Sequence, residues 1–358
     1  MLPAPGGVGA CPFCRFRRQE NTGRVGSGDI SSGSGGARAV YRHIRGQGAA
    51  VARLSAVCKR GKVSHAYIFT GPAGVGKHTT ARAFAAALLC ASPVAGAACG
   101  ECGQCRLYYG MGHPDLVSLY PEESTIKIDQ IRQVVSTVGR KPYHRRHVVI
   151  IDEAEKITAE AQNAFLKTLE DPPGDAVFIL VSAHPHALLP TVLSRCCEVR
   201  FGRVAPGAVA AELSERYHVA EEEAKAVAAL SGGSIGRALE LLHPGLKAVK
   251  DRVLKLAANP SVREILRSGV HNKREAEQWL EFLSLWYRDL LLYRLTRDPG
   301  LVVYADHLPE IEKTTWPVTT LLAAAESVEA ARKMLRANVN PRLVIEGLTV
   351  HLGSILDS

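Results

Sequence analysis

The sequence has 358 residues, a length that accommodates two or three domains. Its hydrophobic content of 46% and charged content of 22% are typical of a globular protein, and its net charge of +9 is compatible with nucleic acid or an acidic partner but diagnostic of neither. No apolar run approaches the roughly 20 residues that cross a membrane, and no apolar signal segment follows Met1. We therefore expect a cytoplasmic protein without a membrane partner, whose 9 cysteines are reduced.

Residues 1–38 are rich in Gly, Ser and Arg and have almost no large apolar side chains. Such a segment cannot bury enough surface to offset its ordering entropy, so we expect a disordered tail. It contains Cys11 and Cys14 at CxxC spacing, which is half of a zinc site and does not establish a function by itself. Apolar residues at helical spacing predict a loop and then a helix within residues 39–62.

The segment His65–Phe84 has the layout of a phosphate-binding loop. It opens with Ala66–Thr70, a short apolar run typical of a buried strand, and continues through the glycine-rich turn GPAGVGK into an alanine-rich helical stretch. Glycines let consecutive backbone N–H groups face an anion, to which the helix N-terminus adds its dipole. An ordinary strand-to-helix turn is the alternative interpretation. We predict that nucleotide phosphates are bound by Gly71, Gly74, Gly76, Lys77, His78 and Thr79.

One position departs from the P-loop pattern. Directly after the lysine, where a Ser or Thr hydroxyl normally ligates Mg²⁺, the sequence has His78. Mg²⁺ prefers oxygen ligands, and an imidazole is a poor substitute. Thr79 lies one residue further on, about 100° around the helix, so its hydroxyl does not replace the missing one. The sequence therefore predicts a loop that can hold ATP or ADP but is impaired in Mg²⁺-dependent hydrolysis.

Four cysteines follow this unit within a short stretch, at the spacing C-x8-C-x2-C-x2-C. Tetrahedral Zn²⁺ needs four soft donors, and CxxC turns bring pairs of thiolates close together. In a reducing compartment such a cluster indicates a metal site rather than disulfides, although small buried cysteines can also cluster by chance. We predict one structural, non-catalytic zinc in a module at residues 90–105, bound by Cys90, Cys99, Cys102 and Cys105.

Strands and helices alternate in the next part of the chain. Strands are expected within residues 113–119, 148–151, 177–182 and 197–201, and helices within residues 128–138 and 159–170. This alternation implies a doubly wound parallel sheet. Between these elements, Arg140–His147 is a basic turn that we expect to be a solvated loop, with a DNA contact as the less favoured alternative.

Two acids, Asp152 and Glu153, directly follow the apolar strand at 148–151. The carboxyl end of a buried parallel strand is where α/β nucleotide sites place their metal and water chemistry. We therefore expect Asp152 to help hold Mg²⁺ and Glu153 to orient the attacking water, a surface pair of acids being the alternative. After Phe201 the pattern is helical: three helices are predicted within 207–242 and four or five amphipathic helices, forming a bundle, from Leu246 onward.

The motifs HAYIFTGPAGVGK, C-x8-C-x2-C-x2-C, IKIDQIR, VVIIDEAEKIT, AQNAFLKTLEDPP, FILVSAHP, LSRC and GSIGRALELL, taken in this order, resemble those of bacterial clamp-loader ATPase subunits of the AAA+ class, most of all the delta-prime type. The resemblance implies a RecA-like α/β AAA+ core with a P-loop and zinc-binding insert at residues 39–203, a small helical lid at 204–245 and an all-α collar at 246–358. It also implies as partners gamma/tau-type and delta-type subunits in a hetero-pentameric ring, the sliding clamp and primed DNA.

The resemblance also assigns roles to single residues. Asp152 and Glu153 correspond to the family's second nucleotide motif, and Ser182 is the nearest match to its first sensor. Arg195, in the Ser-Arg-Cys triplet, matches the arginine finger that reaches the ATP of a neighbouring subunit. A fixed guanidinium beside the γ-phosphate stabilises the charge of the transition state in trans.

Three departures from the family pattern bear on hydrolysis. His78 replaces the Mg²⁺-ligating hydroxyl, Gly236 stands where active subunits have the second-sensor arginine, with Arg237 displaced by one, and the first-sensor region reads Ser-Ala-His-Pro. Because Arg195 is intact, we predict a delta-prime-like subunit that helps load the sliding clamp and supplies its finger without turning over ATP itself. Two alternatives remain open: an active gamma/tau-type motor subunit and a P-loop kinase that acts on a small molecule.

Overall fold

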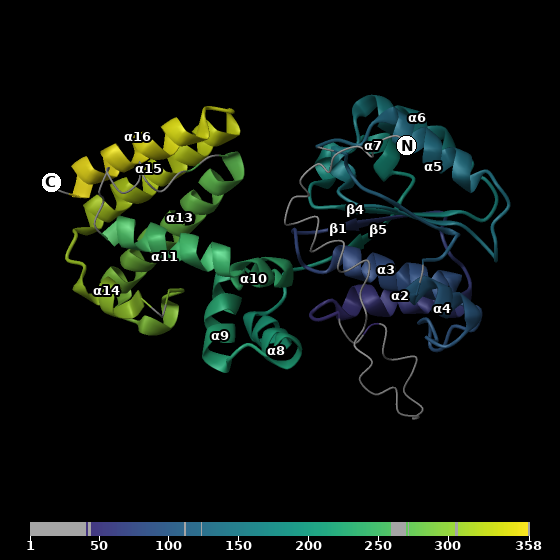
Figure 1. Ribbon diagram of the computed structural model, residues 1–358, viewed down its shortest axis with the longest axis horizontal. Coiled ribbons are helices and arrows are strands. Elements are labelled where there is room, and N and C mark those ends of the chain that lie inside the picture. The colour runs from purple at the N-terminus through teal and green to yellow at the C-terminus, as the bar shows by residue number, and fades with distance from the viewer. Residues whose placement is uncertain are drawn as a thin grey trace, which may run out of the picture. The chain divides into compact units, whose positions relative to one another are not determined.

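The computed structural model (Figure 1) describes residues 41, 44–110, 112–122, 124–258, 270, 272–304 and 307–356. The expectations for residues 1–38, with Cys11 and Cys14, lie outside this part of the chain. Within the described ranges, no helix combines the length and the apolar character that crossing a membrane requires.

A five-stranded parallel sheet forms the first part of the structure, in the order β2-β3-β4-β1-β5. Its strands are β1 (Ala66–Thr70), β2 (Leu116–Leu119), β3 (Val148–Ile151), β4 (Val177–Ser182) and β5 (Cys197–Arg200). Every residue of β1, β3 and β4 is buried, as expected for strands covered on both faces. The predicted doubly wound parallel sheet is confirmed.

Helices cover both faces of the sheet (Figure 1). One face is covered by α2 (Gly48–Arg60), α3 (Lys77–Leu89) and α4 (Gly103–Tyr109), and the other by α5 (Ile128–Val138), α6 (Ala159–Glu170) and the single turn α7 (Pro190–Leu193). An aromatic pair joins a helix to a strand on each face. The ring centroids of Phe84 and Tyr67 are 5.2 Å apart, as are those of Phe165 and Phe178, and both pairs have edge-to-face geometry. Short 3₁₀ turns, η2 (Ala154–Lys156) and η3 (Pro185–Ala187), follow β3 and β4.

The strand expected to start near His113 begins instead at Leu116. In the described chain, Asp115 bonds to β3 only through its carbonyl oxygen, which accepts the N–H of Val148 at 2.8 Å. Its own N–H donates to Nδ1 of His113 at 3.1 Å, and its buried carboxylate accepts from the basic turn before β3. The prediction of a solvated basic turn is correspondingly wrong for its last residue, since His147 is buried.

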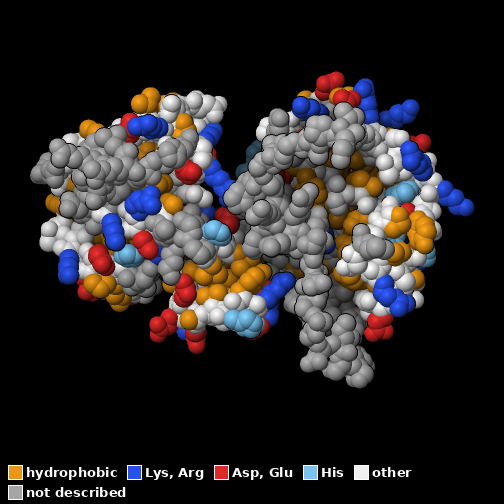
Figure 2. Space-filling model, viewed as in Figure 1, with side chains coloured by type: hydrophobic (Ala, Val, Ile, Leu, Met, Phe, Trp, Pro, Cys, Tyr) orange, Lys and Arg blue, Asp and Glu red, His pale blue; other side chains and the backbone are white. Residues whose placement is uncertain are grey.

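The described chain after Arg200 contains helices and no strand. The three predicted helices are confirmed as α8 (Pro206–Tyr217), α9 (Glu221–Leu230) and α10 (Ile235–Leu241). Figure 2 shows acidic side chains gathered at the first turn of α9, which holds Glu221, Glu222 and Glu223, where the helix dipole favours negative charge. Ser234 caps α10 by accepting the backbone N–H of Arg237 at 3.1 Å.

The remaining helices share one apolar core with α8–α10. They are α11 (Pro244–Ala258), α13 (Lys273–Thr296), α14 (Leu308–Lys313), α15 (Val318–Arg336) and α16 (Pro341–Leu356), with a 3₁₀ turn η4 (Pro299–Leu301). The predicted amphipathic helices after Leu246 are confirmed, and α11 begins two residues earlier than expected because Pro244 suits the first turn of a helix. Trp286 of α13 lies in the core, as expected for the aromatic residues of an amphipathic helix, and Tyr287 beside it is buried as well.

Candidate functional site

The glycine-rich turn joins β1 to α3 and has the backbone that a phosphate-binding loop requires. Gly71, Gly74 and Gly76 have φ angles of +142°, +72° and +98°, which side chains of other residues rarely allow. At Gly71 the space is also closed, because a Cβ would lie 2.2 Å from the carbonyl oxygen of Phe201. Conformation therefore favours glycine at all three positions, and at Gly71 packing requires it as well.

Lys77 occupies the first position of α3 and is only 6% exposed. Its Nζ donates hydrogen bonds of 2.6 Å to the carbonyl oxygens of Gly71 and Pro72, so the ammonium group lies within the turn. Burial lowers the pKa of Lys77, while the carboxylates of Glu155 and Asp152 act in the opposite direction. A phosphate placed in the turn would supply the negative charge that favours this ammonium group.

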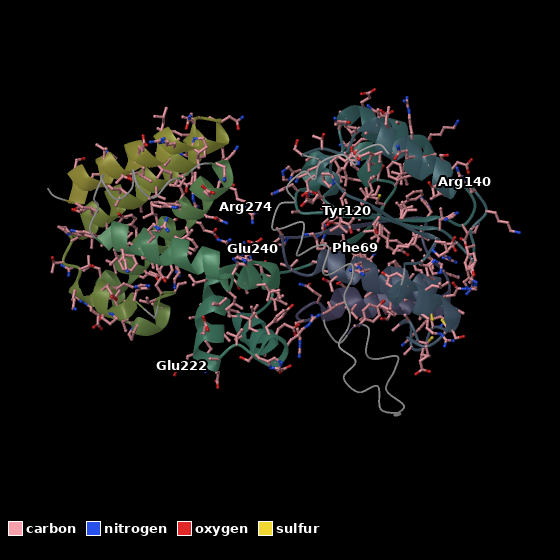
Figure 3. All side chains as sticks on the ribbon, viewed as in Figure 1. Phe69, Tyr120, Arg140, Glu222, Glu240 and Arg274 are labelled. Carbon is pink, nitrogen blue, oxygen red and sulfur yellow. The ribbon has the colours of Figure 1, made fainter. Side chains whose placement is uncertain are left out.

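His78 is half-buried and faces Tyr120, the residue after β2. Its Nε2 lies 3.3 Å from the Tyr120 hydroxyl, and the two rings are 6.0 Å apart (Tyr120 is labelled in Figure 3). Thr79 is exposed, and Thr80 is buried and donates its hydroxyl to the carbonyl oxygen of Gly76 at 2.8 Å. The residue after Lys77, which in a Mg²⁺-binding P-loop carries a hydroxyl, is therefore a histidine in contact with Tyr120.

The two predicted acids follow β3 directly. Asp152 is buried, and its Oδ1 accepts the backbone N–H of Glu153 at 3.0 Å. Glu153 has a φ angle of +49°, which is uncommon for a residue with a side chain, and its carboxylate pairs with Lys156 at 2.6 Å. The unusual backbone turns the two consecutive carboxylates in different directions at the carboxyl end of the sheet.

Ser182 ends β4 opposite Thr70 of β1, so it lies at the same sheet edge as the glycine-rich turn. Its side chain is buried and accepts the backbone N–H of His184 at 3.1 Å. Glu155 also belongs to this edge: its Oε1 accepts the backbone N–H of Ala183 at 3.3 Å. Glu155 was not predicted as a site residue. The sequence analysis assigned only the first two acids after β3, Asp152 and Glu153, although Glu155 also acts on Lys77.

The start of α10 lies against the glycine-rich turn. A Cβ at Gly74 would be 2.2 Å from Oγ of Ser234, and a Cβ at Gly236 would be 2.9 Å from Cα of Gly74. Arg237 does not take the place of the absent sensor arginine, since its guanidinium pairs with Glu240 at 3.1 Å and with Glu281.

Gln47, which precedes α2, is a further residue of this region that the sequence analysis missed. It is buried, and its Nε2 donates to the carbonyl oxygens of Val75 at 3.2 Å and Gly202 at 2.7 Å. The N–H of Gly202 donates back to its Oε1 at 3.3 Å. No local pattern marks a glutamine for such a role, because its partners lie far along the chain.

Arg195 lies between α7 and β5, outside the cluster around Lys77. Its guanidinium pairs with Glu170 at the end of α6 and donates to the carbonyl oxygen of Thr191 at 2.8 Å. The side chain is one-third exposed, so it is held near the surface by its own chain.

The four predicted cysteines come together. Their Sγ atoms all lie within 4.8 Å of one another, with separations of 3.5 Å for Cys90–Cys99, 3.8 Å for Cys90–Cys102 and 3.9 Å for Cys99–Cys105. Tetrahedral zinc with bonds of about 2.3 Å places its sulfurs roughly 3.8 Å apart, so the cluster fits this ion. Cys58, Cys196 and Cys197 lie outside the cluster.

The electrostatics of the cluster also suit a cation. Burial acts to raise the pKa of the Cys102 thiol, but hydrogen bonds from the N–H groups of Cys105 and Ala91 and from neighbouring thiols lower it overall, to about 6. Burial raises the pKa of Cys90 and Cys105. Four thiolates therefore need the charge of a bound metal to coexist, which couples metal binding to proton release.

The strand order β5-β1-β4-β3-β2, the P-loop after β1 and the acids after β3 define a P-loop protein with a RecA-like AAA+ core, extended by a cysteine module and C-terminal helices. Residues 46–205 match the family described as DNA polymerase III, delta subunit, and residues 257–352 match its C-terminal domain family. The chain belongs to the delta-prime family of DNA polymerase III clamp-loader subunits.

Individual relatives agree with this assignment. The chain is 35% identical to DNA polymerase III subunit delta' of Pseudomonas aeruginosa, over 83% of this chain and 94% of that protein. It is 29% identical to subunit delta' of Bacillus subtilis, over 82% of this chain and 91% of that protein. Subunit tau of Bacillus subtilis is 30% identical over 67% of this chain, which corresponds to 47% of the tau sequence.

Proposed function

We propose that this protein is a ring member of the bacterial clamp loader that helps place the sliding clamp on primed DNA without turning over ATP itself. Its partners are gamma/tau-type and delta-type subunits in a hetero-pentameric ring. Its mechanistic contribution is Arg195, which serves as an arginine finger for ATP bound by a neighbouring subunit.

One observation carries the non-hydrolysing part of this proposal: the His78–Tyr120 contact occupies the corner where Mg²⁺ needs a hydroxyl. An imidazole bonded to a phenol offers no oxygen in the position of the usual ligand, and Mg²⁺ demands oxygen in near-octahedral geometry. The packing of Gly236 on Gly74 supports the same conclusion, because it leaves no room for a sensor arginine at position 236.

The retained residues support binding of nucleotide phosphates rather than their hydrolysis. The backbone N–H groups of the turn and the ammonium of Lys77 would hold the phosphates, and Asp152, Glu153 and Ser182 line the same sheet edge. Zinc bound by the cysteine module would cross-link a short segment that has little apolar core of its own.

We infer three functional divisions from the element boundaries: a core at residues 39–203, a lid at 204–245 and a collar at 246–358. The last strand ends at Arg200 and the helical part of the chain begins with α8 at Pro206, which supports the first boundary. The collar helices are the expected site of ring assembly.

Reconstitution tests the proposal. A clamp loader assembled from the subunits of the same bacterium should load its clamp on primed DNA when this chain is present and fail when it is absent. The isolated chain should show no ATP turnover that depends on Lys77. Full loading by the remaining subunits alone contradicts the proposed ring membership.

The motor-type alternative is supported by a specific observation: Lys77 begins α3 after the glycine-rich turn, and Asp152 and Glu153 directly follow β3. It predicts turnover on the order of 1 s⁻¹, abolished in Lys77→Ala. That rate in the isolated chain supports the motor and excludes the non-hydrolysing role.

A further inference from the structure

The edge of the sheet where the parallel strands begin carries exposed cations from two segments. We call this surface the basic edge; it consists of Lys59, Arg60 and Lys62 at the end of α2 and Arg140, Lys141, Tyr143 and Arg145 in the turn before β3. All seven side chains are exposed. Among the described residues, none of its cations forms an ion pair. The P-loop and the two acids lie at the opposite end of β1 and β3.

The end of α2 and the turn before β3 adjoin the same core, since Cys58 packs against the apolar cluster that contains Val148, the first residue of β3. Arg146 is the paired cation of this turn. Its guanidinium, 14% exposed, pairs with Asp175 at 2.9 Å. It also acts on the thiol of Cys58 in α2, whose pKa burial raises to about 11 while Arg146 works in the opposite direction. Arg146 thus neutralises Asp175 beside the turn and, within the described part of the chain, leaves the exposed cations of the basic edge without an acid of their own.

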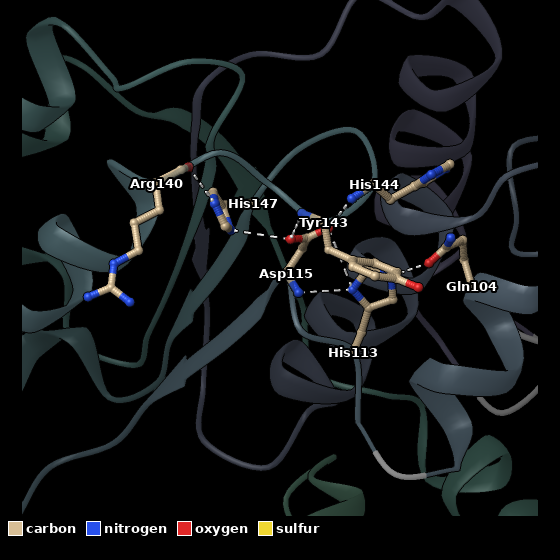
Figure 4. A network of polar contacts seen from close by, with 7 residues as sticks. All are labelled: Gln104, His113, Asp115, Arg140, Tyr143, His144 and His147. Carbon is tan, nitrogen blue, oxygen red and sulfur yellow. Dashed lines mark hydrogen bonds and ion pairs between the residues drawn. The ribbon is translucent and has the colours of Figure 1, made fainter.

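A buried carboxylate fixes the turn. Oδ1 and Oδ2 of Asp115 accept the backbone N–H groups of Tyr143 and His144 at 2.6 and 2.8 Å (Figure 4). Nε2 of His147 lies 3.0 Å from the carbonyl oxygen of Arg140 and closes the turn from its other end. In Figure 4 the Arg140 side chain extends away from this network. A fixed turn loses little entropy when a ligand binds to its exposed side chains.

Tyr143 is the unusual member of the turn, because its side chain is 68% exposed although its backbone is held. Its ring and that of His113 form a T-shaped pair with a centroid distance of 6.5 Å and an interplanar angle of 78°, so His113 covers at most one face of the Tyr143 ring. A cavity of about 220 Å³ adjoins the turn and is lined in part by Arg140, Lys141 and Pro173. A merely solvated loop needs neither the anchored backbone nor the presented ring.

We propose that the basic edge binds single-stranded DNA, with its cations on successive phosphates and Tyr143 stacked on a base. A positively charged groove combined with an exposed aromatic ring is the chemistry that recognises single strands independently of sequence. An acidic protein segment would also be attracted to the cations, but it has no planar group for Tyr143 to stack on. This surface is remote from the P-loop and does not depend on the proposed role in the ring.

Direct binding to the full-length chain tests the proposal. Fluorescence anisotropy with a labelled oligothymidylate of about 20 nucleotides gives the dissociation constant at several NaCl concentrations. The variant Arg140→Glu, Lys141→Glu, Arg145→Glu should weaken binding about 10-fold or more and reduce the salt slope by about 2, since each single-strand phosphate contact contributes about 0.7. Tyr143→Ala should weaken binding about 5-fold or more, and Tyr143→Phe should not.

The matched control reverses three exposed, unpaired cations of the described chain elsewhere: Lys313→Glu, Lys333→Glu, Arg336→Glu. It changes net charge equally and should bind nearly as well as the wild type. Equal losses in both triple variants mean attraction by overall charge only and overturn the proposal, as does absence of binding by the wild type. A labelled polyglutamate that binds as tightly as the DNA, with the same sensitivity to the variants, also overturns it in favour of a protein partner.

Discussion

The backbone N–H of Gly236 donates a 2.9 Å hydrogen bond to the carbonyl oxygen of Gly74. This bond joins the start of α10 to the phosphate-binding turn, and glycine is required on both sides of it, because a Cβ on either residue would collide with the other segment. Position 236, where the family resemblance led us to expect a sensor arginine in active subunits, is therefore in backbone contact with the turn. Helix α10 is bonded directly to the glycine-rich turn through backbone atoms of the chain.

Replacing Gly236 should disrupt this contact. Because a Cβ at position 236 would lie 2.9 Å from Cα of Gly74, Gly236→Arg should lower the free energy of unfolding by about 1–3 kcal/mol. Urea unfolding measures the change, and hydrogen exchange should accelerate at the amide of residue 236. The control is Gly347→Arg in α16, where an added Cβ meets nothing within 4 Å. Equal effects of the two variants contradict the inferred contact.

A hydroxyl placed directly after Lys77 should restore the missing Mg²⁺ ligand. We expect His78→Thr to tighten binding of ATP on the order of 10-fold when Mg²⁺ is present and to leave it unchanged in EDTA, because only the metal uses the new ligand. Calorimetry with both forms of the nucleotide measures this. Tyr120→Phe removes the hydroxyl contact with His78, keeps the neighbouring ring and adds no ligand, so it should show no gain. If Tyr120→Phe also binds ATP more tightly in Mg²⁺, the gain comes from loss of the contact between His78 and Tyr120 and not from a new metal ligand.

The strands and the helices around them were predictable because their signals are local. Val148–Ile151 is a continuous branched run, and Lys77–Leu89 follows glycines that suit only one kind of turn. The cysteine cluster was equally predictable, since its ligands are close in sequence.

The contacts that define the candidate site most sharply were not predictable, because their partners are distant in sequence. Nothing near Gly236 indicates that it meets Gly74, and nothing near His113 indicates that Asp115 is needed by a turn that follows α5. Burial of a polar side chain depends on the whole fold. A local pattern therefore reports such residues as ordinary loop positions.

Purified protein should contain one zinc per chain by elemental analysis. Cys99→Ser with Cys102→Ser should lose it, because removing two of four thiolates leaves an incomplete tetrahedral site. The control is Cys58→Ser with Cys196→Ser, which removes the same number of thiols outside the cluster and should retain the metal. Metal loss in the control, or zinc retained in the first variant, contradicts the assigned ligands.

Acid should weaken the fold through His113. Burial lowers the pKa of His113, with His144 adding to the effect and Asp115 opposing it. Below about pH 6.5 the unfolded chain binds a proton that the folded chain does not, so the free energy of unfolding should fall as the pH decreases. Nε2 of His113 also lies 2.7 Å from Oε1 of Gln104, which stands between two cysteines of the cluster. Protonation of His113 should therefore also affect the cysteine module.

The variant His113→Asn isolates this contribution. It should be less stable than the wild type at pH 8, because the contact with Gln104 is lost, but its stability should change less between pH 7 and pH 5. Urea unfolding at each pH measures the difference. His351→Asn, at an exposed histidine of α16, is the control and should leave the pH dependence unchanged. Parallel pH profiles of the wild type and His113→Asn exclude His113 as the cause.

The last prediction separates two roles of Arg195. If it only pairs with Glu170, then Arg195→Ala and Glu170→Gln break the same contact and should behave alike. If it is a finger, only Arg195→Ala should reduce the DNA- and clamp-stimulated ATPase of the reconstituted loader, whereas Glu170→Gln frees the guanidinium and leaves that rate intact or raised. Fingers supplied in trans contribute roughly 10³–10⁵ in rate, and we expect a smaller loss because other subunits supply their own.

Both of these variants should fold and assemble, since a partly exposed ion pair contributes about 1 kcal/mol or less. Thermal unfolding and gel filtration of the assembled ring establish this before any rate is compared. With assembly confirmed, equal ATPase rates for the two variants at saturating ATP mean that Arg195 stabilises the turn before β5 and nothing more. A loss confined to Arg195→Ala cannot come from the ion pair, because the pair is absent from both variants. Thermal unfolding of Arg195→Ala that matches Glu170→Gln also excludes the lost hydrogen bond to Thr191 as the cause, and the loss then identifies a guanidinium that acts on another subunit's nucleotide.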